Sequence, residues 1–144
     1  MNHNIPFTNR LELEPFTISL ADMLLEKMQI VHINEKDIID TIMLLREHEI
    51  GYENAAETID ARYIVGLLSK DWGFYYTFTT NLAKVREKTA ATKELSEDDR
   101  ADVNRKIQKL ADILEKEPKT FAWKMRAKIG TKNKWYKDVE EIRR

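Results

Sequence analysis

The stretch LADMLLEKMQIVHINEKDIIDTIMLL, residues 20–45, decides the fold class predicted for this chain. Its apolar residues recur at helical spacing on both sides of a polar break near Asn34, which predicts two consecutive helices that are apolar over most of their circumference. Such helices must pack against other elements to bury their apolar surface. One cation, Lys27, lies in the middle of the first helix's apolar stripe and needs an explanation of its own.

Capping residues predict where the helices begin. Ser19 with Asp22, and Asn34 with Asp37, supply side-chain acceptors for the free backbone N–H groups of the first two helices. Gly51 is expected in the loop after the second helix. Later helices are predicted to begin near Thr58, at Asp71, at Ser96 and at Pro118, the last of these ending at Gly130, and Trp135, Val139 and Ile142 suggest a final short helix. The sequence therefore predicts a mainly α bundle of about six or seven helices.

The N-terminal segment has the pattern of a strand rather than a helix. Residues 11–14, Leu-Glu-Leu-Glu, alternate strictly, and Pro6 and Pro15 bound the alternating run. We predict one or two short N-terminal β-strands within residues 5–18. A strand edge without a neighbour exposes unpaired backbone groups, so we expect this edge to pair with another chain.

The length of the chain predicts one compact domain overall. A chain of 144 residues can bury a substantial core without disulfides. Within it we expect a short β segment at 1–18, a helical core at 19–87, a linker at 88–95 and C-terminal helices with a basic aromatic tail at 96–144. The linker is placed at 88–95 because the residues there are mostly small and polar.

Composition excludes several classes of site. The chain has no cysteine, which excludes disulfides, thiolate zinc sites and cysteine nucleophiles. The three histidines are scattered, so no metal site is predicted. No apolar run approaches the ~20 residues that span a bilayer, and no signal-peptide pattern opens the chain. We expect a cytoplasmic protein with no membrane contact.

Charge is unevenly distributed along the chain, although the net charge is only −1. Residues 1–58 hold 4 Lys/Arg against 11 Asp/Glu, whereas residues 118–144 hold 9 against 3. The basic tail could meet phosphate or nucleic acid, or it could lie against the acidic front of the same chain. Both interpretations stay open at this point.

Lys27 is predicted to point inward from the first helix. A helical wheel places Asp22, Glu26 and Gln29 together on the side expected to face water, with apolar residues around Lys27 on the other side. Two interpretations follow. Lys27 could cover apolar surface with its stem and pair its ammonium with a carboxylate, or it could lie at the floor of a cleft and bind an anion such as a phosphate.

The second helix carries a confined polar cluster made of Lys36, Asp37 and Asp40. Lys36 and Asp40 are four residues apart and can form an ion pair on the helix surface. Asp37 and Asp40 could instead serve a metal or a proton relay, but carboxylates three apart are abundant on ordinary helices. Their spacing alone does not decide between these uses.

Short segments spread along the chain carry a family resemblance: Phe7-x-x-Arg10-Leu11, Pro15-x-Thr17-Ile18, Leu24-Leu25-x-Lys27-Met28-Gln29-Ile30-Val31, Asn34-x-Lys36-Asp37-Ile38-x-Asp40 and Leu44-Leu45, with further similarity in Asp71–Tyr76, Trp123–Arg126 and Lys134–Tyr136. Together they resemble the C-terminal part of nucleotidyltransferase-like proteins of the polymerase-beta-like superfamily, near the AbiEii-type toxin nucleotidyltransferases. In that family a small mixed sheet carries the catalytic residues and a helical region packs behind it. The resemblance implies that this chain is the helical half of such a protein.

The catalytic motifs of that family are missing from this chain. The family uses a Gly-Ser turn, an Asp-x-Asp that binds Mg²⁺ and a third carboxylate. None of the four glycines stands in a Gly-Ser pair or before an Asp-x-Asp. We therefore assign no catalytic residue, expect no cofactor for the chain alone and predict no transferase activity from it. Mg²⁺ and a nucleoside triphosphate are expected only together with a catalytic half, and the resemblance implies that Met1 begins inside the domain.

The resemblance also implies roles and partners. Lys27 would contact a phosphate of the nucleotide, and Lys36, Asp37 and Asp40 would support the nucleotide cleft. The expected partners are the missing N-terminal catalytic half, or a second copy that pairs with the N-terminal strand. An RNA acceptor is a further expected partner of the basic tail.

The basic tail also supports a hypothesis that needs no catalytic half. Residues 118–137 hold seven Lys/Arg and no acid, interleaved with four aromatic residues, a composition typical of surfaces that combine phosphate contacts with base stacking. The candidate nucleic-acid contacts are Lys124, Arg126, Lys128, Lys132, Lys134 and Trp135. Alternatively, the aromatic residues anchor the segment to the core and the lysines form a solvated face. In a third interpretation the chain is a helical scaffold that binds a protein partner.

Overall fold

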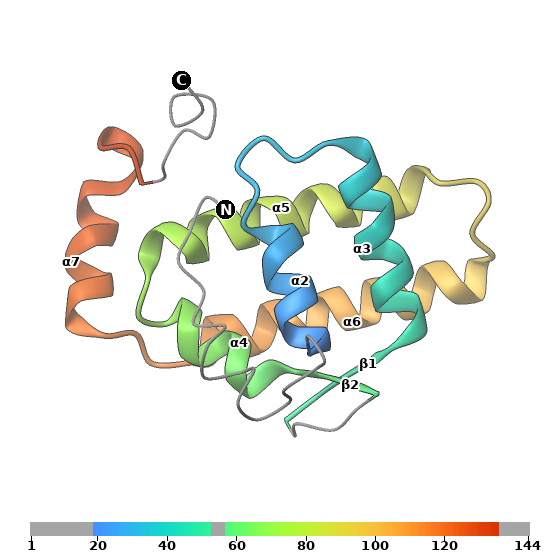
Figure 1. Ribbon diagram of the computed structural model, residues 1–144, viewed down its shortest axis with the longest axis horizontal. Coiled ribbons are helices and arrows are strands. Elements are labelled where there is room, and N and C mark those ends of the chain that lie inside the picture. Colours follow the sequence, from blue (N-terminus) through green and yellow to red (C-terminus); the bar gives the residue numbers. More distant parts are fainter. Residues whose placement is uncertain (1–18, 53–56, 136–144) are drawn as a thin grey trace.

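A computed structural model describes residues 19–52 and 57–135, most of which lie in helices (Figure 1). The elements are α2 (Leu20–Met28), α3 (Glu35–Glu47), β1 (Glu49–Gly51), β2 (Thr58–Asp60), α4 (Ala61–Leu68), α5 (Trp72–Ala91), α6 (Glu97–Lys116), α7 (Phe121–Ile129) and the 3₁₀-helix η1 (Gly130–Lys132). The two strands pair in parallel, with Glu49 opposite Thr58 and Gly51 opposite Asp60. The predicted mainly α fold with short strands is confirmed.

The two longest helices, α5 and α6, organise the bundle. They lie against each other along the long axis of the molecule, and α2, α3 and α4 pack against them (Figure 1). Helix α2 contacts α3, α4, α5 and β2, so it lies at the centre of the bundle. Helix α7 stands at one end and contacts α5 (Figure 1).

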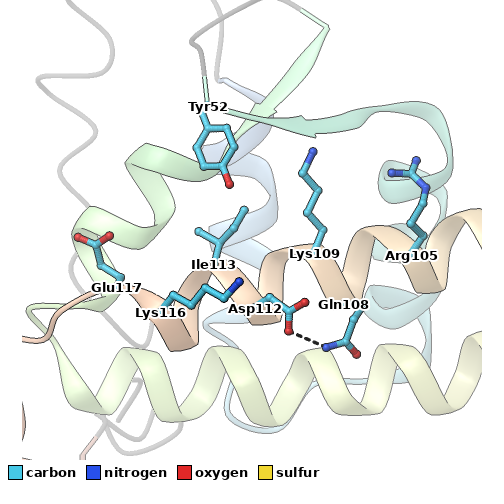
Figure 2. Close-up of a pocket in the computed structure, with 8 residues that line it drawn as sticks. All are labelled: Tyr52, Arg105, Gln108, Lys109, Asp112, Ile113, Lys116 and Glu117. Carbon is cyan, nitrogen blue, oxygen red and sulfur yellow. Dashed lines mark hydrogen bonds between the residues drawn. The ribbon is translucent and has the colours of Figure 1, made fainter.

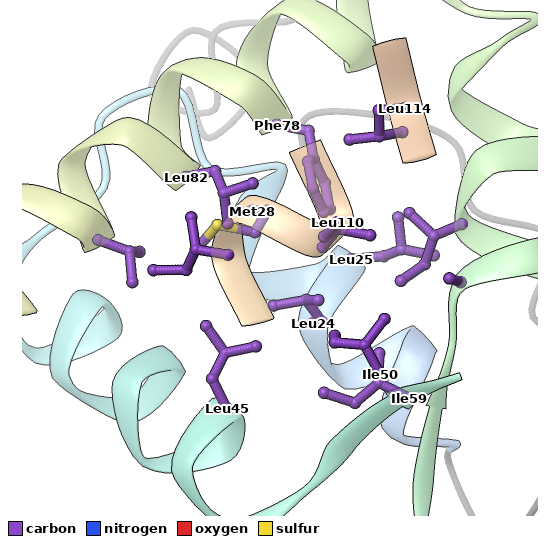
Figure 3. Close-up of a cluster of buried hydrophobic side chains, with 14 of the residues drawn as sticks. Leu24, Leu25, Met28, Leu45, Ile50, Ile59, Phe78, Leu82, Leu110 and Leu114 are labelled. Carbon is purple, nitrogen blue, oxygen red and sulfur yellow. The ribbon is translucent and has the colours of Figure 1, made fainter. Parts of the chain in front are cut away.

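The core is a single cluster of buried apolar side chains drawn from α2 to α6 and from both strands (Figure 3). Leu24, Leu25 and Met28 of α2 have no exposed surface and lie in the middle of this cluster. Removing a side chain of this size from water contributes roughly 1.5–3 kcal/mol, so burial of the α2 stripe is a large share of the stabilisation. The apolar spacing within α2 thus places this helix in the core of the bundle.

The predicted N-terminal caps are confirmed for four helices. The side chains of Ser19, Asn34, Asp71 and Ser96 each accept a hydrogen bond from the backbone N–H three residues later, at 3.1, 2.9, 3.0 and 3.1 Å. Each bond satisfies one of the N–H groups that the first turn of a helix leaves without a partner. These positions could be predicted because the cap depends only on local sequence.

The start of α4 differs from the prediction. Thr58 belongs to β2, and the helix begins at Ala61 with Asp60 as its N-cap. Gly51, expected in a loop, is the last residue of β1 and lies opposite β2. A Cβ at Gly51 would lie 2.7 Å from the Cγ2 of Thr58, so glycine permits this close approach of the two strands.

The start of α7 also differs. The helix begins at Phe121 with Thr120 as its N-cap, so Pro118 lies before it rather than in its first turn. The backbone N–H of Thr120 donates to the carbonyl oxygen of Ser69 at 3.1 Å, which ties this cap to the end of α4. The hydroxyl of Thr120 accepts from the backbone N–H of Trp123 at 3.1 Å, so a local cap of the same kind as the others marks the start of α7.

The linker predicted at 88–95 starts later in the structure, because α5 continues to Ala91. Thr89 is buried, and its hydroxyl donates to the carbonyl oxygen of Val85 at 2.7 Å. Arg100 of α6 donates to the carbonyl oxygens of Thr89, Thr92 and Leu95 at 3.2, 2.7 and 3.2 Å. This guanidinium closes the end of α5 and bonds to the start of the connection that follows it.

The residues of α2 that are exposed to water also differ from the prediction. Asp22 and Gln29 are buried, whereas Met23, placed on the inner side by the wheel, is 43% exposed. The reason is that α2 has neighbours on several sides, so one apolar stripe does not define its buried surface. The predicted N-terminal strands and the part of the last helix beyond Trp135 lie outside the described residues.

Two buried polar side chains close helix C-termini from a distance. The side-chain amide of Asn81, on α5, donates to the carbonyl oxygens of Met28 and Ile30 at 3.0 and 2.7 Å, just at the end of α2. The ammonium of Lys106, on α6, donates to the carbonyl oxygen of Leu45 at 2.7 Å near the end of α3. Neither helix has a glycine just after its end, so these side chains satisfy carbonyl groups that would otherwise be buried without partners.

Stability should fall in acid because of the carboxylate beside Lys106. Asp102 accepts hydrogen bonds from Lys106 and Arg105, both at 2.8 Å, and these bonds lower its pKa below the ordinary value of 3.8. A carboxylate whose pKa is lowered by folding stabilises the folded state above its unfolded pKa, and this stabilisation is lost as the pH falls through the folded pKa. We expect the unfolding free energy to decrease from about pH 5 downward. Asp102→Asn should flatten this decrease in urea titrations, and an unchanged slope would contradict the assignment.

Candidate functional site

An aromatic cluster anchors α7 to the start of α5. The ring of Tyr75 meets that of Trp123 edge-on at 5.2 Å between centroids, and Trp135 meets Tyr76 edge-on at 4.9 Å. The indole N–H of Trp135 donates to the hydroxyl of Thr77 at 2.9 Å. Aromatic pairs in this geometry add roughly 0.5–1.5 kcal/mol beyond the area that they bury. The cluster therefore holds α7 in one orientation on the bundle.

Two of the basic residues near α7 also belong to this anchor. Lys119 donates to the carbonyl oxygens of Leu114 and Glu117, both at 2.6 Å, and its ammonium lies 5.3 Å from the ring centre of Tyr75. Burial lowers the pKa of Lys119 below its usual value. Arg126 lies 4.8 Å from the ring of Trp72 and donates to the carbonyl oxygen of Gly130 at 2.7 Å. These cations stabilise α7 and the turn after it.

The opposite side of α7, called the outer face here, carries exposed apolar side chains. Phe121, Met125 and Ile129 are 78%, 45% and 42% exposed and are four residues apart. At this spacing they form one ridge along the helix. Lys124 and Lys128 are exposed beside the ridge, and Lys132 is exposed in η1. Contiguous exposed apolar surface of this kind marks interaction sites on proteins.

The structure divides the predicted nucleic-acid contacts into two groups. Lys124, Lys128 and Lys132 are exposed together near the outer face, and Lys134 is exposed beyond η1. Arg126 and Trp135 are half-buried in the anchor. The second interpretation of the tail, in which aromatic residues anchor it to the core, therefore describes Trp123 and Trp135 well.

The predicted cluster around Lys27 does come together. Its ammonium donates to Asp37 Oδ1 at 2.9 Å and to Asp40 Oδ2 at 3.2 Å, and Lys36 lies 3.4 Å from the same oxygen of Asp40. The hydrogen bond with Asp37 is the main cause of a raised pKa of Lys27, and the one with Lys27 is the main cause of a lowered pKa of Asp40. About a third of the Lys27 side chain, 33%, is exposed. The positive charges of Lys27 and Lys36 are thus matched by the negative charges of Asp37 and Asp40.

A cavity of about 660 Å³ lies between Tyr52, at the end of β1, and the face of α6 (Figure 2). Two of its three cations, Arg105 and Lys109, have partners in the protein, and the third, Lys116, is exposed. Arg105 lies 3.0 Å from Glu49 and 2.8 Å from Asp102, and Lys109 donates to the carbonyl oxygen of Ile50 at 2.8 Å. The amide of Gln108 donates to Asp112 at 2.8 Å across the same face (Figure 2). The bonds of Arg105 and Lys109 hold the sheet on α6.

Metal and membrane sites find no support among the described residues. In residues 19–52 and 57–135 no group of three or more His, Asp and Glu side chains is arranged to hold a metal ion. Over the same ranges no helix combines the length and apolar character needed to cross a bilayer.

Sequence reasoning missed the apolar part of the outer face. It selected the cations and Trp135, and it did not consider Met125 or Ile129. The available signal was the i, i+4, i+8 spacing of Phe121, Met125 and Ile129 within a segment that has no acid. Periodicity shows that three residues share a face, but it does not show whether that face is buried or exposed.

Comparisons with known proteins assign no family to this geometry. The chain matches no protein-family model, no curated protein and no solved structure. The resemblance to nucleotidyltransferase-like proteins stays a prediction that rests on the segments quoted above.

Proposed function

We propose that this protein is a helical binding module that docks on a protein partner through the outer face of α7. The observation that supports this function is the exposed ridge of Phe121, Met125 and Ile129. Three large apolar side chains on one exposed helix face cost free energy in water, and burial against a partner would recover it. Amphipathic helices commonly bind partners through anchors spaced in this way.

A protein partner fits the outer face better than single-stranded nucleic acid does. Base stacking needs exposed aromatic rings between the cations. The rings of Trp123 and Trp135 pack against Tyr75 and Tyr76, so they are engaged within the molecule. Phe121 is the exposed ring of α7, and the other two members of the ridge are aliphatic or thioether side chains, which suit an apolar surface.

Photo-crosslinking tests this function. A benzophenone amino acid in place of Phe121 should yield a discrete protein adduct in an extract of the cells that make the protein. The matched control carries the same amino acid in place of Tyr52, which is 52% exposed and lies outside α7, just after β1. The adduct should disappear when Met125→Ser and Ile129→Ser are added, because the apolar ridge would be lost.

Three outcomes would contradict the proposal. One is the absence of any adduct from position 121, and another is the same set of adducts from positions 121 and 52. The third is an adduct that ribonuclease removes and protease does not, which would make nucleic acid the partner. Retention of the adduct in the Lys27→Ala background would show that the Lys27 cluster has no part in docking.

The nucleotidyltransferase-like role of Lys27 stays a separate prediction, and it requires the catalytic half. Lys27→Ala in the complete enzyme should weaken nucleotide binding, because the ammonium would no longer contact a phosphate. Lys84→Ala is the matched control, since Lys84 is an exposed lysine of α5 that does not belong to the Lys27 cluster. The two carboxylates that hold Lys27 would have to release it to an anion, so unchanged nucleotide affinity in Lys27→Ala would leave the cluster with a structural role only.

A further inference from the structure

The charge around the ridge specifies what kind of partner surface it meets. Residues 118–135 contain six Lys/Arg and no Asp or Glu. Lys119 and Arg126 are bonded to backbone carbonyl groups and lie over aromatic rings. Lys124, Lys128 and Lys132 are exposed, and within the described part of the chain none of them forms an ion pair. Their charges are therefore available to a partner.

The two exposed lysines of α7 itself lie on one side of the ridge only. At about 100° per residue, Lys124 and Lys128 fall beside Phe121 on one flank of the helix. On the other flank Arg126 turns towards Trp72, at 4.8 Å from its ring. The outer face is thus an apolar ridge with a row of positive charge along a single border. A complementary surface must be apolar in the middle and acidic along one border.

A second copy of the chain does not supply that surface through the same face. In an antiparallel symmetric pair of α7 helices the two lysine rows would lie on the same side, and in a parallel pair each row would face the flank of the other helix that carries Arg126. In neither arrangement does α7 supply an acidic residue to compensate. Like charges brought together in an interface oppose association. The partner surface must therefore carry carboxylates that α7 itself lacks.

We infer that the partner of the outer face is a protein surface with an apolar centre and a row of Asp or Glu side chains along one border. The inference rests on the proposed docking function and adds the chemistry and orientation of the partner. The apolar ridge provides most of the affinity, and the one-sided charge selects the partner and fixes its direction.

Three synthetic helical peptides test this inference. They share one leucine stripe and differ only along one border of it, which carries Glu, Gln or Lys. Binding to the whole protein would be measured by fluorescence anisotropy. We expect the Glu peptide to bind about tenfold more tightly than the Gln peptide, and this preference to shrink in high salt. We expect no binding of the Lys peptide.

Charge reversal on α7 gives the sharpest form of the test. Lys124→Glu with Lys128→Glu should reverse the order, so that the Lys peptide binds best. The matched control, Lys84→Glu with Lys93→Glu, changes the net charge equally at exposed lysines outside α7 and should keep the original order. Reversal in both double variants would mean that net charge alone decides, which would overturn the inference.

The remaining outcomes separate the inference from the proposed function. Equal binding of the Glu and Gln peptides, abolished by Met125→Ser with Ile129→Ser, would overturn the acidic partner and leave docking through the ridge intact. Failure of all three peptides to bind would count against both. Tighter binding of a single-stranded RNA or of phosphatidylglycerol vesicles than of the Glu peptide would overturn the inference in favour of a polyanion.

Discussion

Replacing Lys106 with methionine is expected to lower the free energy of unfolding by about 3 kcal/mol. The side chain of Lys106 is buried, with 4% of the residue exposed, and its ammonium donates to the carbonyl oxygen of Leu45 at 2.7 Å and to Asp102 at 2.8 Å. Methionine keeps the apolar stem but leaves a buried carbonyl without a donor. It also removes the ammonium that donates to the carboxylate of Asp102. One carbonyl group and one carboxylate therefore each lose a hydrogen-bond donor.

Urea unfolding followed by circular dichroism would measure this effect. Lys109→Met is the matched control, because Lys109 lies on the same helix and donates to one carbonyl oxygen, that of Ile50, from a less buried position. We expect the control to lose only about 1 kcal/mol. Equal losses of unfolding free energy in the two variants would mean that the bond from Lys106 to the end of α3 stabilises the protein no more than the bond of Lys109 does.

The second large effect is expected at Asn81. Asn81→Leu should cost about 2–3 kcal/mol, because the amide that donates to both Met28 and Ile30 disappears from a position that is 1% exposed. Leucine is similar in size, so the loss would come from two unsatisfied carbonyl groups rather than from a cavity. The carbonyl groups at the end of α2 would lose the hydrogen bonds that the side chain of Asn81 donates.

Thermal unfolding would check this prediction. A loss of this size should lower the melting temperature by roughly 5–10 °C in a chain of this length. Thr79→Val is the control on the same helix, since the hydroxyl of Thr79 bonds only to carbonyl groups of its own helix, Tyr75 and Tyr76. A melting temperature of Asn81→Leu equal to that of Thr79→Val would contradict the role given to Asn81.

Local sequence accounts for the features that depend on near neighbours. The caps at Ser19, Asn34, Asp71 and Ser96 were predictable because a cap is a bond between residues three apart. The pair of Lys36 and Asp40 was predictable for the same reason, at one helical turn. The mainly α class followed from apolar periodicity repeated along the chain.

Features that depend on contacts between elements were mispredicted. Thr58 reads as a helix start, but pairing with Glu49 places it in a strand. Residues 88–91 read as a linker, but the buried Thr89 and the guanidinium of Arg100 keep them in α5. In each case a contact with a neighbouring element, β1 for Thr58 and α6 for Thr89, accompanies the departure from local preference.

The outer face of α7 shows the same division between what local sequence determines and what tertiary contacts determine. The sequence by itself determined that residues 118–135 are basic and that Phe121, Met125 and Ile129 share one helix face. Only the tertiary structure decided which face of α7 packs on α5 and which stays exposed, because that choice depends on Trp72, Tyr75 and Tyr76 some fifty residues earlier. Periodicity defines a face, but burial is a property of what that face meets in space.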